Sequence, residues 1–225
     1  MMNVTYFRPR KPGPEVEIED AVVGQVANLF PNEGHLAWMA GSLPVGSGMP
    51  DLVLVMCDPK VTSLANFDLP DSHILSYLHS VGHATSETIT KRVGGKRKKT
   101  LRCLDELVNA NAALVHSNTY SLSPNWRDTL PEVITIEAKV KNWKRAVEQA
   151  VRNRIFSHKS FVALPSLVAV RVQNEDIFQN YGIGLLSVSN DEVRIIRRAP
   201  RNQPRVWAYY YQLVFHAANH LSESL

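Results

Sequence analysis

The sequence predicts an α/β fold, in which a mixed sheet is flanked by helices, and three observations lead to this prediction. Residues 51–56 and 132–140 are apolar runs of the kind found in buried strands. A helical pattern of apolar residues from 142 to about 156 follows the second run. Between the two runs, from 67 to 126, short helical patterns prevail instead. We therefore expect one sheet whose strands are separated in the sequence by a helical segment.

Length and composition exclude several classes of protein. At 225 residues the chain can form one large domain or two small ones, and 44% of its residues are hydrophobic. No apolar run approaches the roughly 20 residues of a membrane span, and residues 1–10 lack the apolar region of a signal peptide. Cys57 and Cys103 lie far apart and outside any Cys-x-x-Cys pattern, so we expect buried free thiols and no zinc site. We expect a cytoplasmic protein without membrane contact.

The positive charge of the chain is concentrated in one short block. The net charge is +4, yet the segment from 91 to 102 holds seven basic residues and no acidic one. A block this compact is either a solvated, disordered run or a surface that binds nucleic acid. Its members are Lys91, Arg92, Lys96, Arg97, Lys98, Lys99 and Arg102.

The surroundings of this block favour the second interpretation. Helical patterns cover residues 71–81, 86–93 and 98–110, and Gly94-Gly95 separates the second from the third. Two short strands follow, on either side of Ser117-Asn118. This order resembles a winged helix-turn-helix domain, and it places the basic residues where a recognition helix meets DNA. A helical insert that contacts a protein partner is the alternative.

Ionisable residues interrupt both apolar runs, where a buried charge needs a partner. Pro50-Asp51 opens the first run, and Glu137-Ala138-Lys139 lies near the end of the second. Carboxylate oxygens are the ligands that Mg²⁺ selects, and Lys139 projects from the same face of the strand as Glu137, two residues earlier. A solvated pair on an edge strand would show the same Glu-x-Lys pattern.

The combination of Pro-Asp with Glu-x-Lys resembles the signature of the PD-(D/E)XK nuclease superfamily. The order of elements is also similar, since two apolar runs are followed by a long amphipathic helix. The resemblance implies a restriction-endonuclease-like core in which Asp51, Glu137 and the carbonyl of Ala138 hold Mg²⁺, with Mn²⁺ as a substitute. It also implies that Lys139 positions the attacking water or stabilises developing charge.

The resemblance suggests two further site residues on helices. Residues 15–30 form a predicted helix, and its Glu19 is our candidate for a first-helix glutamate that points at the metal. The acids of this helix can equally serve only to complement the helix dipole. Gln149 resembles a helix glutamine that contacts the site in some branches, although a glutamine at the edge of the core fits as well. On the same helix, Lys144 and Arg145 give a basic surface suited to phosphates.

The spacing of the two runs sets the expected domain boundaries. Asp51 and Glu137 are 86 residues apart, which is too far for neighbouring strands joined by an ordinary loop. An insert of about sixty residues removes this difficulty. We expect a nuclease-like core at 1–66 and 127–225, interrupted by a winged helix-turn-helix insert at 67–126.

These observations lead to one expected function and its alternatives. We expect a divalent-metal-dependent endonuclease that hydrolyses phosphodiester bonds of duplex DNA. The alternative from another class is a DNA-binding regulator or accessory subunit with an inactive nuclease-like core. The intact set of Asp51, Glu137 and Lys139 favours activity. A nuclease directed at RNA, a homodimer and a protein partner of the insert remain open.

Overall fold

The computed structural model describes residues 3–31, 34–46, 48–124, 126, 130–190 and 192–223. The chain divides into two compact units. The sheet unit combines Met1–Met56 with Glu132–Arg205, and the helical unit combines Cys57–Pro131 with Val206–Leu225. The boundary expected at residue 127 lies outside the described residues.

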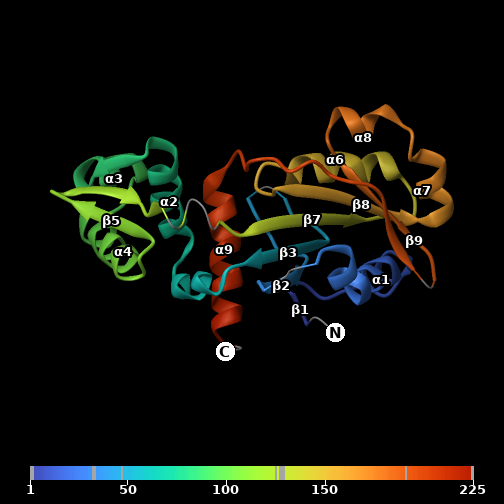
Figure 1. Ribbon diagram of the computed structural model, residues 1–225, viewed down its shortest axis with the longest axis horizontal. Helices are drawn as coiled ribbons and strands as arrows, with labels where there is room; N and C mark the ends of the chain where they lie inside the picture. The colour runs from blue at the N-terminus through green and yellow to red at the C-terminus, as the bar shows by residue number, and fades with distance from the viewer. Residues whose placement is uncertain are drawn as a thin grey trace. The chain divides into compact units, whose positions relative to one another are not determined.

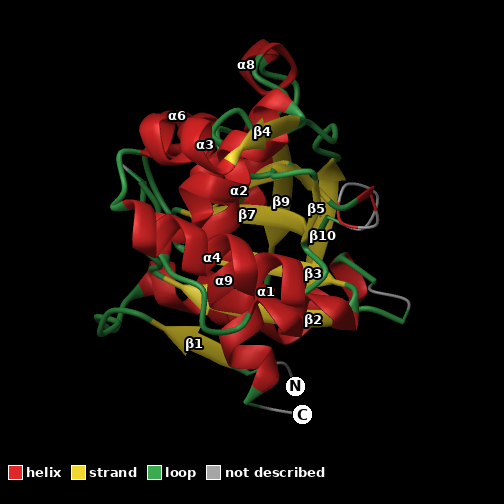
Figure 2. Cartoon of the chain, turned by 90° about the vertical axis from the view of Figure 1, so that its left-hand side faces the viewer, coloured by secondary structure: helices red, strands yellow, loops and turns green. Residues whose placement is uncertain are grey.

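The sheet unit contains a seven-stranded mixed sheet in the order β1-β2-β3-β7-β8-β9-β10. β3 pairs antiparallel with β7, β7 to β9 run parallel, and β10 returns antiparallel. Figure 2 draws the strands in yellow. The predicted α/β class, with a mixed sheet flanked by helices, is confirmed. The strands are β1 Val4–Tyr6, β2 Leu36–Gly41, β3 Leu52–Cys57, β7 Glu132–Ala138, β8 Lys159–Pro165, β9 Gly184–Val188 and β10 Val193–Arg197.

Different helices cover the two faces of this sheet, as Figure 1 shows. α1 packs its Val22 and Val26 on one face, in a cluster that includes Ile136 of β7. α6 packs its Val147 on the other face, in a cluster that includes Val162 of β8. Because alternate residues of a strand point to opposite faces, residues 133, 135 and 137 of β7 face away from α1. The helices are α1 Pro14–Leu29, α6 Trp143–Asn153, α7 Ser166–Val172 and α8 Asp176–Asn180.

The pairing of β3 with β7 joins the two apolar runs of the sequence. Leu52 lies opposite Ile136 in an antiparallel register. Asp51 immediately precedes β3, so this register places it beside Glu137, near the end of β7. The residues between the two strands belong to the helical unit.

The helical unit contains a small three-stranded antiparallel sheet, in the order β4-β6-β5, and several helices. Its core includes Ile74, Ile89, Leu104 and Leu107, which are all buried. Gly94 takes a left-handed conformation that ends α3 before α4 begins. The elements are η1 Pro59–Leu64, α2 Leu69–Val81, β4 His83–Thr85, α3 Ser86–Val93, α4 Arg97–Asn109, β5 Ala113–His116, β6 Thr119–Leu122 and α9 Trp207–Ser222.

The terminal helix α9 belongs to the helical unit, which differs from the expected assignment of 127–225 to the core. Phe215 of α9 stacks on Phe67 at 5.5 Å between ring centroids, and Tyr211 Oη lies 3.0 Å from Nδ1 of His79 on α2. The amphipathic pattern of α9 predicts that it covers an apolar surface, but the pattern does not specify which one. In the described part of the chain, neither α9 nor any other helix is long and apolar enough to cross a membrane.

Candidate functional site

The carboxyl end of β7 brings Asp51 and Lys139 together. The Oδ2 atom of Asp51 accepts a hydrogen bond from the backbone N–H of Ala138 at 2.8 Å and lies 3.1 Å from Lys139 Nζ. Lys139 Nζ also donates to the carbonyl oxygen of Ala138 at 2.8 Å. A fourth residue, Glu15 of α1, lies 3.4 Å from the same ammonium group. The ammonium therefore lies among oxygens from three separate segments of the chain.

Glu137 is the most deeply buried charged residue of this group, with a relative exposure of 1%. Its Oε1 atom accepts a hydrogen bond from Asn153 Nδ2 at 2.6 Å, whereas its Oε2 atom has no hydrogen-bond partner among the described residues. Burial and the nearby charge of Asp51 raise the pKa of Glu137 to about 8, against the opposing effects of Asn153 and Lys139. A buried acceptor without a donor is unfavourable, so a proton or a bound cation would stabilise it.

Glu19 lies near the same charges, but it is already paired. Arg10 forms an ion pair with Glu19 at 3.3 Å and another with Asp20 at 2.8 Å. Burial and the charge of Asp51 raise the pKa of Glu19 to about 7, and Arg10 and Lys139 oppose this shift. Glu19 therefore interacts electrostatically with the site from α1. Sequence reasoning did not single out Glu15, although its position one helical turn before Glu19 places both residues on one face.

Two polar residues of α6 point to the same region of the sheet unit. Gln149 and Asn153 are four residues apart and so share a face of the helix. The Oε1 atom of Gln149 is buried and has no hydrogen-bond partner in the part of the chain that the structure describes. None of the hydrogen bonds between described residues joins Gln149 to Asp51, Glu137 or Lys139. Sequence reasoning missed Asn153, because an uncharged residue inside an amphipathic helix gives no signal of its own.

The oxygens at the end of β7 have the chemistry that suits a hard divalent cation. Within the described residues, no group of three or more His, Cys, Asp and Glu side chains is arranged to hold a metal ion. The predicted set is smaller, with two carboxylates and the carbonyl of Ala138. Asp51 Oδ2 and the Ala138 carbonyl contact the Lys139 ammonium, while Glu137 Oε2 has no donor in the described part of the chain. These hard oxygens fit Mg²⁺ or Mn²⁺, which usually keep several water ligands in addition.

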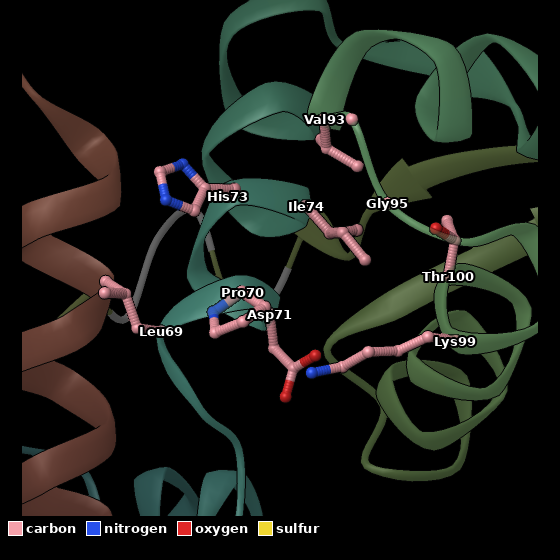
Figure 3. A pocket seen from close by; sticks show the side chains of 10 residues that line it. Leu69, Pro70, Asp71, His73, Ile74, Val93, Gly95, Lys99 and Thr100 are labelled. Atoms are coloured by element: carbon pink, nitrogen blue, oxygen red, sulfur yellow. The ribbon is translucent and has the colours of Figure 1, made fainter.

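The seven basic residues between positions 91 and 102 are all exposed, but they do not have equal surroundings. Lys99 pairs with Asp68 at 3.1 Å, and Arg102 pairs with Glu106 at 2.7 Å. Figure 3 shows Lys99 and Asp71 pointing toward one another across a cavity of about 370 Å³ between α2 and the turn before α4. No ion pair among the described residues involves the other five, which are Lys91, Arg92, Lys96, Arg97 and Lys98.

Three of these cations, Lys96, Arg97 and Lys98, lie at the start of α4, which is the positive end of the helix dipole. Lys96 is the N-cap residue of α4, it makes no side-chain capping bond, and the first turn contains no acid. Positive side chains at a helix N-terminus destabilise the helix when no ligand is bound. An anion at the same place is stabilised by both the dipole and the cations. The start of α4 is therefore suited to a phosphate group.

The basic residues predicted on α6 lie in the sheet unit. Lys144 and Arg145 are exposed in the first turn of α6, five and six residues after Lys139. Asn142 precedes them in a left-handed conformation and makes no side-chain capping bond. This helix start therefore lies close along the chain to Glu137 and Lys139 at the end of β7.

No family model, curated protein or solved structure matches this chain. The chemistry available at the site is given by its own groups: one buried carboxylate with an unpaired oxygen, a second carboxylate, a backbone carbonyl and a lysine ammonium. Such a set can hold a divalent cation and can place a positive charge beside an anionic substrate.

The raised pKa of Glu137 predicts a pH-dependent stability of the metal-free protein. Between pH 4.5 and about 8 the folded chain keeps a proton that the unfolded chain has lost. The stabilisation is complete below pH 4.5 and is lost as the pH rises, by up to about 1.4 kcal/mol per pH unit. Denaturant unfolding of the wild type and of Glu137→Gln at several pH values measures this, and the variant should show the shallower decline. Parallel profiles would contradict the assignment.

Proposed function

We propose that the chain is a divalent-metal-dependent DNA endonuclease with Asp51, Glu137 and Lys139 at its reaction centre. The proposal rests on the position of these residues together at the end of β7, where one buried oxygen of Glu137 has no donor among the described residues. A strand that follows Pro-Asp, a strand that ends in Glu-x-Lys and an amphipathic helix occur in the order that resembles the PD-(D/E)XK superfamily.

The proposed metal ligands are Asp51, Glu137 and the carbonyl of Ala138. When bound, the ion would lower the pKa of a water molecule and polarise a phosphoryl oxygen. The two carboxylates would balance the charge of a divalent ion, and the ion would offset both the burial and the repulsion from Asp51 that raise the pKa of Glu137. Glu19 and Gln149 are proposed to border this site.

Lys139 is proposed to act as a charged group and not as a base. Burial works against its positive charge, yet the carboxylates of Asp51, Glu15 and Glu137 together raise its pKa above the ordinary value. Its ammonium therefore stays protonated at neutral pH and can only donate hydrogen bonds. Placed beside a phosphate, it would orient the attacking water or stabilise the negative charge that develops in the transition state.

The basic surfaces of both units are proposed to hold the phosphate backbone of duplex DNA. In the helical unit, the exposed cations at the start of α4 lie where the helix dipole already favours an anion. In the sheet unit, Lys144 and Arg145 offer a second basic surface. Contacts of this kind supply affinity and orientation without reading the sequence.

One observation favours a DNA-binding regulator or accessory subunit with an inactive core. The Lys139 ammonium already contacts two of the three proposed ligand oxygens, at 3.1 Å and 2.8 Å. An arrangement that is neutralised in this way needs no metal for its stability. Incubation of plasmid DNA with the chain in Mg²⁺, Mn²⁺ or EDTA distinguishes the two functions, because only the nuclease cleaves and only with a metal present.

Removal of the site residues should abolish cleavage while DNA binding remains. We expect Glu137→Gln and Lys139→Ala each to slow plasmid cleavage by about 100-fold or more, since each removes a group from the reaction centre. The matched controls are Glu148→Gln and Lys141→Ala, which change exposed residues of the same types. A mobility shift in EDTA should be unchanged for all four variants. Wild-type cleavage rates in both site variants would refute the site.

The start of α4 should carry part of the salt dependence of DNA binding. We expect Arg97→Glu with Lys98→Glu in the full chain to weaken binding, because both side chains are exposed and without ion pairs among the described residues. If each side chain binds one phosphate in the wild type, the slope of log K against log salt should become shallower by about 0.9 for each phosphate that the variant no longer binds. Lys60→Glu is the control on an exposed lysine of the same unit. Equal slopes in the double variant and the wild type would exclude α4 as a phosphate-binding element.

A further inference from the structure

Asn153, the last residue of α6, donates a side-chain hydrogen bond to Glu137. Its exposure is 2%, and its Nδ2 donates to Glu137 Oε1 over 2.6 Å. The two oxygens of the carboxylate thereby become different, because Oε2 has no hydrogen-bond partner among the described residues. A buried carboxylate with one oxygen fixed can rotate less than one with both oxygens unpaired.

The end of α6 is itself tied to β7, the strand that carries Glu137. The carbonyl of Asn153 accepts hydrogen bonds from Ser157 Oγ at 3.0 Å and from the backbone N–H groups of Phe156 and Ser157, both at 3.1 Å. The Ser157 hydroxyl lies 3.3 Å from that of Thr135, two residues before Glu137 on the same face of β7. The donor and the acceptor of the Asn153–Glu137 hydrogen bond are therefore anchored to one strand.

The Asn153 amide lies beside Gly48, on the side away from its hydrogen bond to Glu137. A Cβ atom added to Gly48 would lie 3.3 Å from Asn153 Oδ1 and 3.5 Å from the ring of Phe156. Gly48, which has no side chain, thus leaves room for the amide oxygen. A rotated amide would turn its oxygen toward the carboxylate, where two acceptors would repel each other. This repulsion disfavours the rotated amide, so the amino group of Asn153 stays directed at Glu137.

We propose that Asn153 is a positioning residue, which fixes Glu137 Oε1 so that Oε2 alone is presented to the divalent cation. The inference rests on the proposed nuclease function. An asparagine suits this task because it donates a hydrogen bond without adding charge. A lysine or arginine at the same position would neutralise the carboxylate and repel the cation. Partners of this kind typically change metal affinity by about 10–100-fold when they are removed.

The test is Mn²⁺ binding to the full chain without DNA, measured by the paramagnetic resonance signal of free Mn²⁺. Asn153→Leu keeps the approximate volume, and Asn153→Ala keeps only the Cβ; neither can donate to Glu137. Both should bind Mn²⁺ about 10–100-fold more weakly than the wild type. In the cleavage assay, the Mn²⁺ concentration for half-maximal rate should rise by a similar factor, and saturating Mn²⁺ should restore most of the rate.

The matched control is Ser157→Ala. This variant removes a hydrogen bond to the same end of α6 but leaves the donor to Glu137 in place. It should lose thermal stability and keep its Mn²⁺ affinity within about twofold, because the backbone N–H groups of Phe156 and Ser157 still hold the Asn153 carbonyl and the amide still donates to Glu137. Thermal unfolding of all variants shows whether each one is folded under the conditions of the measurement.

The outcomes separate this inference from the proposed function. Cleavage and Mn²⁺ binding by the wild type, with unchanged affinity in both Asn153 variants, would overturn the inference alone. An equal decrease of affinity in Ser157→Ala and the Asn153 variants would also overturn it, because the effect would then come from packing of the helix end. A wild type that neither binds Mn²⁺ nor cleaves DNA would overturn the proposed function and the inference with it.

Discussion

The burial of the Glu137 carboxylate beside Asp51 is the interaction on which the rest of the site depends. A carboxylate withdrawn from water is unfavourable unless it is paired, and a second acid nearby adds repulsion. The surrounding residues reduce this unfavourable energy in different ways. Asn153 donates to one oxygen of Glu137, Lys139 pairs with Asp51, and Arg10 neutralises Glu19 on α1. Among the described residues, one oxygen of Glu137 has no donor, and a divalent cation would supply the missing positive charge.

The helical unit also contains charges that are not fully compensated, and there the excess charge is positive. The cations at the start of α4 weaken the helix, because they meet the positive end of its dipole. Lys99 and Arg102 are paired with acids, whereas Arg97 and Lys98 have no ion pair among the described residues. Each unit thus contains a local electrostatic arrangement that is unfavourable for folding and that a partner of opposite charge would relieve. Such conflicts are expected at functional sites.

The sequence predicts the elements that have strong local patterns. The apolar runs of β3 and β7, the stripe of α1 and the amphipathic pattern of α6 indicate their own secondary structure, and the α/β class follows from their order. Asp51, Glu137 and Lys139 are noticeable because charge is unusual within such runs. Asn153, the pairing of Arg10 with Glu19 and the packing of α9 in the helical unit are not predictable in this way. They depend on contacts between distant segments, and nothing in the local pattern of any one segment specifies its partner.

Anomalous diffraction from crystals of the wild-type chain grown with Mn²⁺ tests most directly whether the end of β7 is a metal site. The arrangement of oxygens predicts an Mn²⁺ peak bonded to Glu137 Oε2, to Asp51 and to the carbonyl of Ala138, with Asn153 still on Glu137 Oε1. It also predicts that the Lys139 ammonium leaves the two oxygens it now contacts. A structure in saturating Mn²⁺ with no peak at the end of β7, and with Lys139 still bound to Asp51 and Ala138, would contradict the metal site and the nuclease activity inferred from it.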